Sequence, residues 1–138
     1  CKSSQKSTMP PIFRPLTVGQ AHNFILQQLG NPSFQLIDVR TPTEFNEGHI
    51  SGSVNIDWLN STAHQSFNRI AKTDVVLLYC RSGKRSLAAA NHLNKQGYQS
   101  VYHISGGILA WLTTYSTLTP DPKNEVIDSV PSPQQYKK

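Results

Sequence analysis

The sequence predicts an α/β fold in which a mostly parallel central sheet is flanked by helices on both faces. Two observations lead to this prediction. Residues 75–79 form a continuous apolar run, Val-Val-Leu-Leu-Tyr, which is typical of a central parallel strand that is covered on both sides. Helical and strand patterns also alternate along the chain with short connections, and this order is the one that produces a parallel sheet.

Each element follows from its spacing and from the residues that start or stop it. Apolar residues recur at helical spacing after Thr17, which can cap a helix, and the pattern stops at Gly30. An alanine-rich helix over 86–96 ends before Gly97, a residue suited to the position after a helix C-terminus. The remaining predicted elements are strands over 34–39, 54–56 and 101–104 and a helix over 108–115.

Length and composition leave room for one folded domain. The chain has 138 residues, of which 37% are hydrophobic and 15% charged, and no apolar run approaches the ~20 residues that a transmembrane helix needs. Two cysteines, Cys1 and Cys80, are too few for a disulfide scaffold or a four-cysteine zinc site. We expect a flexible tether over 1–15, the domain over 16–115 and a proline-rich tail over 116–138.

A candidate nucleophile and three cationic side chains directly follow the apolar strand, in the segment Cys-Arg-Ser-Gly-Lys-Arg over 80–85. A turn from a strand to a helix at the carboxyl edge of a parallel sheet is a common ligand site. Small Ser82 and Gly83 let the backbone N–H groups converge on one point, and the helix start favours negative charge there. Cys80 in this place should hold its sulfur as a thiolate, although a lone cysteine after a strand is often a buried structural thiol.

Three cations of this loop, Arg81, Lys84 and Arg85, form the most compact basic cluster in a chain with a formal net charge of +5. The sequence shows no long basic stripe and no interleaving of basic and aromatic residues, so a nucleic-acid partner is not expected. The cluster suits a small anion. The sequence does not indicate an oligomeric state.

Two further segments complete a pattern with the six-residue loop over 80–85. Before the loop stand Leu-Ile-Asp-Val-Arg over 36–40, Glu-Phe at 44–45, Gly-His-Ile-Ser-Gly-Ser over 48–53 and Asn-Ile at 55–56. After it stands Gly-Gly-Ile-Leu-Ala-Trp over 106–111. In these three segments the chain resembles single-domain rhodaneses, the thiosulfate sulfurtransferase family, and the resemblance implies a rhodanese-like fold.

The resemblance also implies a reaction. In rhodaneses the loop cysteine, here Cys80, takes a sulfane sulfur from thiosulfate or a related small anionic donor as a persulfide and passes it to cyanide or a thiol. The backbone and side chains of the loop would bind the anion, which assigns substrate binding to Arg81, Ser82, Gly83, Lys84 and Arg85. No metal and no organic cofactor is implied. The resemblance gives structural roles to the signature residues Asp38, Arg40, His49, Gly106, Gly107 and Trp111.

Two alternatives to a sulfurtransferase remain. Cysteine phosphatases and arsenate reductases of related fold use a longer Cys-x5-Arg loop, whereas Arg85 follows Cys80 as Cys-x4-Arg, and Tyr79 stands where a phosphatase often has histidine. A non-catalytic rhodanese-like binding module is the other alternative. Such modules commonly lack the cysteine or the cations, and this chain has both.

The first residue suggests a location outside the cytoplasm. A cysteine followed by a polar, flexible stretch resembles a mature bacterial lipoprotein, in which Cys1 would carry the lipid and tether the domain to a membrane. We therefore expect a periplasmic or other extracytoplasmic protein. The alternatives are a signal peptide removed with no lipid attached, or an arbitrary chain start and a cytoplasmic domain.

Overall fold

In residues 11–121, which the computed structural model describes, the strands form one five-stranded sheet in the order β1-β5-β4-β2-β3. Every neighbouring pair is parallel. The strands are β1 (Ile12–Leu16), β2 (Phe34–Asp38), β3 (Val54–Asn55), β4 (Val75–Tyr79) and β5 (Ser100–Ile104). The helices are α1 (Val18–Gln28), α2 (Pro42–Glu47), α3 (Ala63–Phe67), α4 (Lys84–Lys95) and α5 (Gly107–Thr114).

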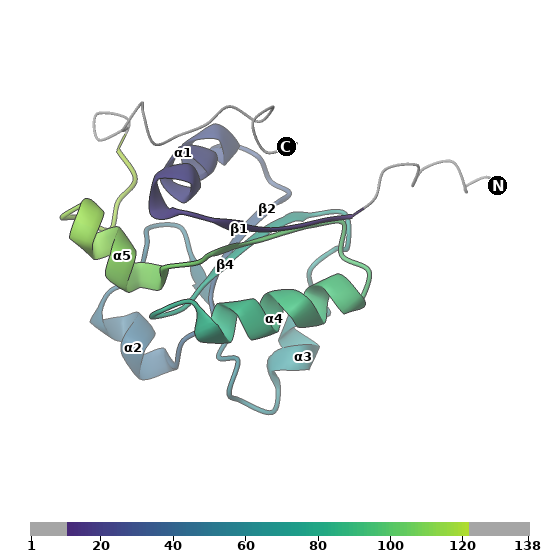
Figure 1. The fold of residues 1–138 in the computed structure, drawn as a ribbon. Helices are drawn as coiled ribbons and strands as arrows, with labels where there is room; N and C mark the ends of the chain where they lie inside the picture. The colour runs from purple at the N-terminus through teal and green to yellow at the C-terminus, as the bar shows by residue number, and fades with distance from the viewer. Residues whose placement is uncertain (1–10, 122–138) are drawn as a thin grey trace.

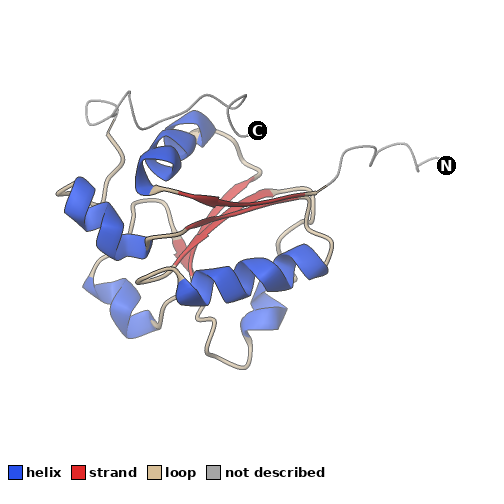
Figure 2. Cartoon of the chain, viewed as in Figure 1, coloured by secondary structure: helices blue, strands red, loops and turns tan. Residues whose placement is uncertain are grey.

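Helices cover both faces of the sheet, which confirms the predicted α/β architecture (Figures 1 and 2). Helices α1 and α5 lie on one face, and α3 and α4 lie on the other (Figure 1). Side chains of β4 alternate between the two resulting cores, because successive residues of a strand point to opposite faces. Leu77 and Tyr79 pack toward α1 and α5, whereas Val76, Leu78 and Cys80 pack toward α3 and α4.

The ends of the helices follow from local sequence. Thr17 caps α1 through a capping box, in which its side chain accepts the N–H of Gln20 and the Gln20 side chain accepts the N–H of Thr17. Thr41 and Glu44 form the same arrangement at the start of α2. These caps fix where α1 and α2 begin, and the second one also holds the Glu44 carboxylate near Arg85 of the loop over 80–85.

Three short elements are absent from the sequence-based prediction. Helices α2 and α3 have six and five residues, too few to show a helical repeat of apolar positions. The strand β1 occupies residues 12–16, so most of it falls in the segment that the sequence predicts to be a tether. It is an edge strand paired only with β5, a position that tolerates Pro15 because one side of its backbone needs no partner.

The first residues of the predicted proline-rich tail also contact the domain. The indole N–H of Trp111 donates to the carbonyl of Thr117 at 2.9 Å, and the N–H of Ser51 donates to the carbonyl of Leu118 at 2.9 Å. Residues 116–121 therefore extend the packed part of the chain beyond α5. Cys1, the predicted lipid anchor, lies outside the described residues. Within those residues, no helix has the length and apolar character needed to cross a membrane.

Candidate active site

Cys80 lies directly after β4, at the carboxyl edge of the parallel sheet. Its side chain faces α4 and is buried, with an exposed fraction of 1%. The Sγ atom accepts the backbone N–H groups of Gly83 at 3.1 Å and Ser86 at 3.3 Å. The loop therefore curls around its own first residue and directs two amides at the sulfur. The N–H of Gly83 belongs to the predicted nest over 81–85, whereas that of Ser86 lies one residue beyond it.

The start of α4 adds the field of a helix N-terminus to these two hydrogen bonds. Gly83 is the N-cap residue, with a φ of +108°, and the helix runs for 12 residues from Lys84. The first N–H groups of a helix have no intrahelical partners and carry a partial positive charge. Because the sulfur lies against these groups, negative charge on Sγ is stabilised by the backbone alone.

The loop is held in place by the segment that leads into α5. The N–H of Ile108 donates to the carbonyl of Cys80 at 2.9 Å, and the N–H of Leu109 donates to the carbonyl of Arg81 at 3.1 Å. These bonds connect the first turn of α5 to the first two residues of the loop. The start of α5 therefore fixes the position of the loop backbone through these two hydrogen bonds.

Two glycines permit this close approach. A Cβ atom on Gly83 would collide with the carbonyl oxygen of Ser105, and a Cβ atom on Gly107 would collide with the carbonyl of Arg81. Both also have positive φ angles, +108° and +66°, which residues with a side chain rarely adopt. The close approach gives Gly107, predicted to be a structural signature residue, a direct contact with the active-site loop. A Cβ on Gly106 would press on the side chain of Ala110 within α5.

We expect Gly107→Ala to destabilise the domain by at least about 2 kcal/mol, because a left-handed backbone and a backbone collision both oppose the new methyl group. Gly97→Ala is the matched control. Gly97 also has a positive φ, +93°, but nothing lies within 4 Å of the point that a Cβ atom would occupy there, so only the backbone cost of about 1 kcal/mol applies. Urea denaturation measures both, and equal losses would show that the loop contact contributes nothing.

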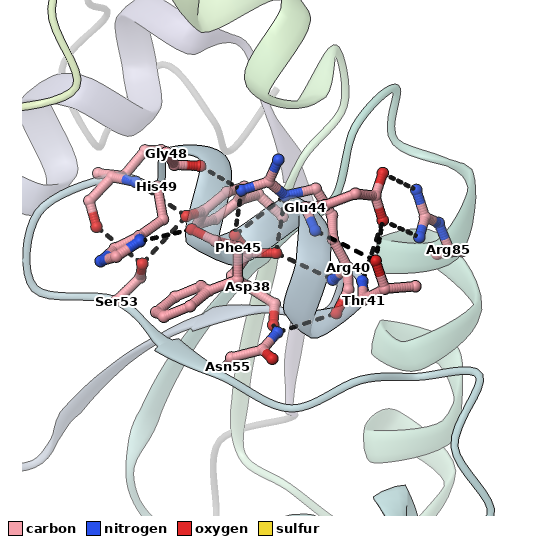
Figure 3. Close-up of polar contacts among 12 residues, drawn as sticks. Asp38, Arg40, Thr41, Glu44, Phe45, Gly48, His49, Ser53, Asn55 and Arg85 are labelled. Atoms are coloured by element: carbon pink, nitrogen blue, oxygen red, sulfur yellow. Dashed lines mark hydrogen bonds and ion pairs between the residues drawn. The ribbon is translucent and has the colours of Figure 1, made fainter.

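The three cations of the loop differ in their surroundings. Arg81 and Lys84 are exposed, and neither forms an ion pair within residues 11–121. Arg85 instead makes a bidentate pair with Glu44 of α2, with N–O distances of 2.8 and 3.1 Å (Figure 3). The hydrogen bonds from Arg85 lower the pKa of Glu44 to about 2. Among the described residues, Arg81 and Lys84 are therefore the two cations of the loop whose charge no ion pair neutralises.

Asp38 and Arg40 form a buried pair at the end of β2 (Figure 3). The Asp38 carboxylate accepts a hydrogen bond from the backbone N–H of Arg40 at 2.9 Å. It accepts two more from nitrogens of the Arg40 guanidinium, at 3.0 and 2.6 Å. The same guanidinium donates to the carbonyl of Gly48 at 2.6 Å, and the Asn55 amide donates to the carbonyls of Asp38 and Arg40. These contacts connect the loops that follow β2 and α2.

His49 and Trp111 also make contacts away from the sulfur. The Nδ1 atom of His49 lies 2.9 Å from the carbonyl oxygen of Phe45, and its ring stacks on the Phe45 ring with centroids 3.7 Å apart (Figure 3). Trp111 is fully buried in the core on the α1 side of the sheet. Within residues 11–121, no group of three or more His, Cys, Asp or Glu side chains is placed to hold a metal ion.

Two residues near the sulfur carry no predicted role. Ser86 lies in the first turn of α4, and its hydroxyl lies 3.7 Å from Cys80 Sγ. The Nδ1 atom of His103, on β5, lies 3.2 Å from the same hydroxyl. Only Ser86 could have been suspected from the sequence, because it follows the loop directly. His103 is 23 positions from Cys80, and only the register of β4 with β5 brings it near.

Comparisons with known proteins agree with this geometry. The family model described as a rhodanese-like domain matches residues 22–114. Thiosulfate sulfurtransferase GlpE of Tolumonas auensis is 38% identical over 84 residues, covering 61% of this chain and 77% of that protein. The chloroplastic thiosulfate sulfurtransferase 16 of Arabidopsis thaliana is 31% identical over 106 residues, covering 70% of this chain and 84% of that protein.

A solved structure shows the same architecture. The crystal structure of a rhodanese-related protein from Thermoplasma volcanium matches with a TM-score of 0.62 and 25% identity, covering 73% of this chain and 92% of that one. The fold, the loop and the signature segments thus agree with the sequence relationships. The chain belongs to the rhodanese-like domain family.

Proposed function

We propose that this protein is a sulfurtransferase that moves a sulfane sulfur from thiosulfate, or a related small donor, to cyanide or a thiol through a persulfide on Cys80. The Cys80 thiolate attacks the outer sulfur of thiosulfate. A bond forms between Sγ and that sulfur, the S–S bond of thiosulfate breaks, and sulfite leaves with the electron pair. Cyanide then attacks the outer sulfur of the persulfide, which yields thiocyanate and regenerates the thiolate.

The observation that carries this proposal is the pair of backbone amides at Cys80 Sγ, those of Gly83 and Ser86. They stabilise the thiolate that the attack requires and the same thiolate when it is the leaving group in the second step. Relatives named thiosulfate sulfurtransferase support the same reaction. The loop directs its amides at a single sulfur atom, which suits sulfur transfer better than the binding of a tetrahedral phosphate.

Charge and exposure support a small anionic donor. Arg81 and Lys84 are exposed cations beside the loop, so they would attract a dianion and stabilise departing sulfite. Cys80 itself has an exposed fraction of only 1%. A donor must therefore present a narrow terminal atom to the sulfur, and the outer sulfur of thiosulfate meets that requirement.

The test is the mass of the intact protein after incubation with thiosulfate and removal of excess donor. We expect the mass to rise by one sulfur atom at Cys80, and added cyanide should remove this sulfur as thiocyanate. Protein alkylated at Cys80 beforehand is the control and should gain nothing. If unmodified protein took up no sulfur from thiosulfate or from a panel of persulfide donors, the non-catalytic binding module would be the better interpretation.

We expect Arg81→Ala and Lys84→Ala each to raise the KM for thiosulfate by roughly three- to tenfold, because each removes an unpaired positive charge near the bound dianion. Added salt should raise the KM of the wild type and should affect the two variants less. Lys95→Ala is the matched control, since Lys95 is an exposed cation at the far end of α4. A KM that stays flat in both variants and across the salt series would contradict the electrostatic explanation.

A further inference from the structure

A buried polar pair lies against the sulfur of Cys80, in the core between the sheet and α4. The hydroxyl oxygen of Ser86 lies 3.7 Å from Cys80 Sγ and 3.2 Å from the Nδ1 atom of His103. Ser86 has an exposed fraction of 0% and His103 of 4%. The three side chains therefore form a continuous contact from the sulfur to β5, within the core between the sheet and α4.

The position of His103 follows from the strand. Val101 packs in the core on the α4 side, and His103, two residues further along β5, points to the same face. Its register partners on the neighbouring strands are Leu78 on β4 and Pro15 on β1, which are both apolar. Burial in these surroundings lowers the pKa of His103 and so favours the neutral form of the ring.

The Ser86 hydroxyl can donate only one hydrogen bond at a time, so its donor role depends on which neighbouring atom accepts it. The Ser86 hydroxyl has one proton to donate and gives it to the carbonyl of Gly83 at 3.2 Å, while the Cys80 thiol donates to the Ser86 oxygen at 3.7 Å. Once Cys80 is a thiolate its sulfur can only accept, so it competes with the Gly83 carbonyl and the His103 ring for the Ser86 proton. If His103 carries its proton on Nδ1, it donates to Ser86, and the Ser86 proton is then available to the thiolate. If the proton is on Nε2, Nδ1 accepts the Ser86 proton and the thiolate loses this donor.

We propose that His103 is a positioning residue that acts through Ser86, donating from Nδ1 so that the Ser86 hydroxyl becomes a third hydrogen-bond donor to the Cys80 thiolate. The inference rests on the proposed function, since a thiolate is what the attack on a sulfane sulfur requires. The step moves no proton between residues and forms no covalent bond. It orients one hydroxyl and adds to the donors that the backbone of Gly83 and Ser86 already provides.

Cys80 is the titratable group that faces this contact. On the face of the sheet that α4 covers, β4 presents Val76 and Leu78 before it reaches Cys80, and β1 presents Pro15. The charged or titratable residues of α4 lie elsewhere: Lys84 and Lys95 are exposed, Arg85 pairs with Glu44, and His92 stacks on His64. A change in the ionisation of Cys80 on replacing His103 is therefore assigned to the contact through Ser86.

The test compares His103→Leu with His103→Asn in a Cys1→Ser background, so that Cys80 is the only thiol. Leucine removes the N–H donor, whereas the asparagine amide can still donate to Ser86. The readouts are the thiolate absorbance of Cys80 across a pH series and the rate of its alkylation by iodoacetamide at a pH below the midpoint of the wild-type titration, where the rate follows the thiolate fraction. We expect His103→Leu to slow alkylation by about three- to tenfold, the size of one net hydrogen bond, and to move the thiolate titration to higher pH. His103→Asn should largely restore both.

A double-mutant cycle checks that the effect passes through Ser86. In a Ser86→Ala background, His103→Leu should change the alkylation rate little, because the hydroxyl that His103 orients is already gone. Ser86→Ala removes a single buried oxygen atom and so provides a variant that should fold if His103→Leu does not. Alone, it should slow alkylation at least as much as His103→Leu. His64→Asn, an exposed histidine on α3, is the matched control and should change neither readout.

The outcomes separate this inference from the proposed function. Wild-type alkylation rates and thiolate titration in folded His103→Leu, or in Ser86→Ala, would overturn the role of His103. Equal effects of His103→Leu with and without the Ser86 hydroxyl would also overturn it, because the contact would then act by another route. If the variants change alkylation and titration as expected but the wild type accepts no sulfur, the proposed function is overturned instead, since neither readout involves a sulfur donor.

Discussion

Cys80→Ser is expected to reduce sulfur transfer by at least about a thousandfold, because a serine hydroxyl cannot carry a sulfane sulfur through the two steps of the reaction. The substitution replaces sulfur by oxygen in the same position, so the amides of Gly83 and Ser86 keep an acceptor. The fold should survive, and the loss is then one of chemistry. Thiocyanate formation from thiosulfate and cyanide measures it.

Cys1→Ser is the matched control, since it removes the other cysteine of the chain without touching the loop. It should leave the turnover of the domain unchanged. Substantial thiocyanate formation by Cys80→Ser would contradict the assignment of Cys80 as the nucleophile and, with it, the persulfide mechanism. Retained activity in Cys1→Ser with loss in Cys80→Ser would assign sulfur transfer to the loop cysteine alone.

The sequence is sufficient to predict the parts of the site that depend on neighbouring residues. The apolar run of β4, the loop that follows it and the start of α4 are contiguous, so their order alone places Cys80 at a helix N-terminus at the edge of a parallel sheet. The predicted backbone nest over 81–85 is also local, because these residues directly follow Cys80. In the structure the N–H of Gly83, inside that segment, and the N–H of Ser86, one residue beyond it, are directed at the sulfur.

The sequence does not predict the contacts that depend on how distant segments meet. Arg85 looks like one of three equivalent cations, but α2, which is too short to be recognised from its pattern, brings Glu44 against it. His103 lies on a strand and reaches Ser86 only because β5 is paired with β4 under α4. In both cases the partner is fixed by strand order and helix placement, which local propensities do not encode.

The buried pair of Asp38 and Arg40 combines a local contact with a distant one. The carboxylate and the guanidinium are two residues apart, whereas the bond from Arg40 to the carbonyl of Gly48 connects different segments. Asp38 has an exposed fraction of 0% and Arg40 of 5%. A charge this deeply buried is stable only when it is paired and hydrogen-bonded, so removing one partner is costly even if the pair itself contributes little.

Arg40→Leu should therefore lower the free energy of unfolding by about 3–5 kcal/mol, because it leaves the Asp38 carboxylate buried without its counter-ion. Asp38→Asn combined with Arg40→Leu should recover part of this loss, since no unpaired charge then remains, and the amide oxygen can still accept the backbone N–H of residue 40.

Glu44→Gln is the matched control for the partly exposed pair with Arg85. Its side chain is 24% exposed, and glutamine can keep the capping box with Thr41, so the cost should stay under about 1 kcal/mol. Urea denaturation of all three variants measures these changes. If Arg40→Leu lowered the free energy of unfolding no more than Glu44→Gln does, burial would not explain the contribution of Arg40 to stability. The structural role given to Asp38 and Arg40 would then need another explanation.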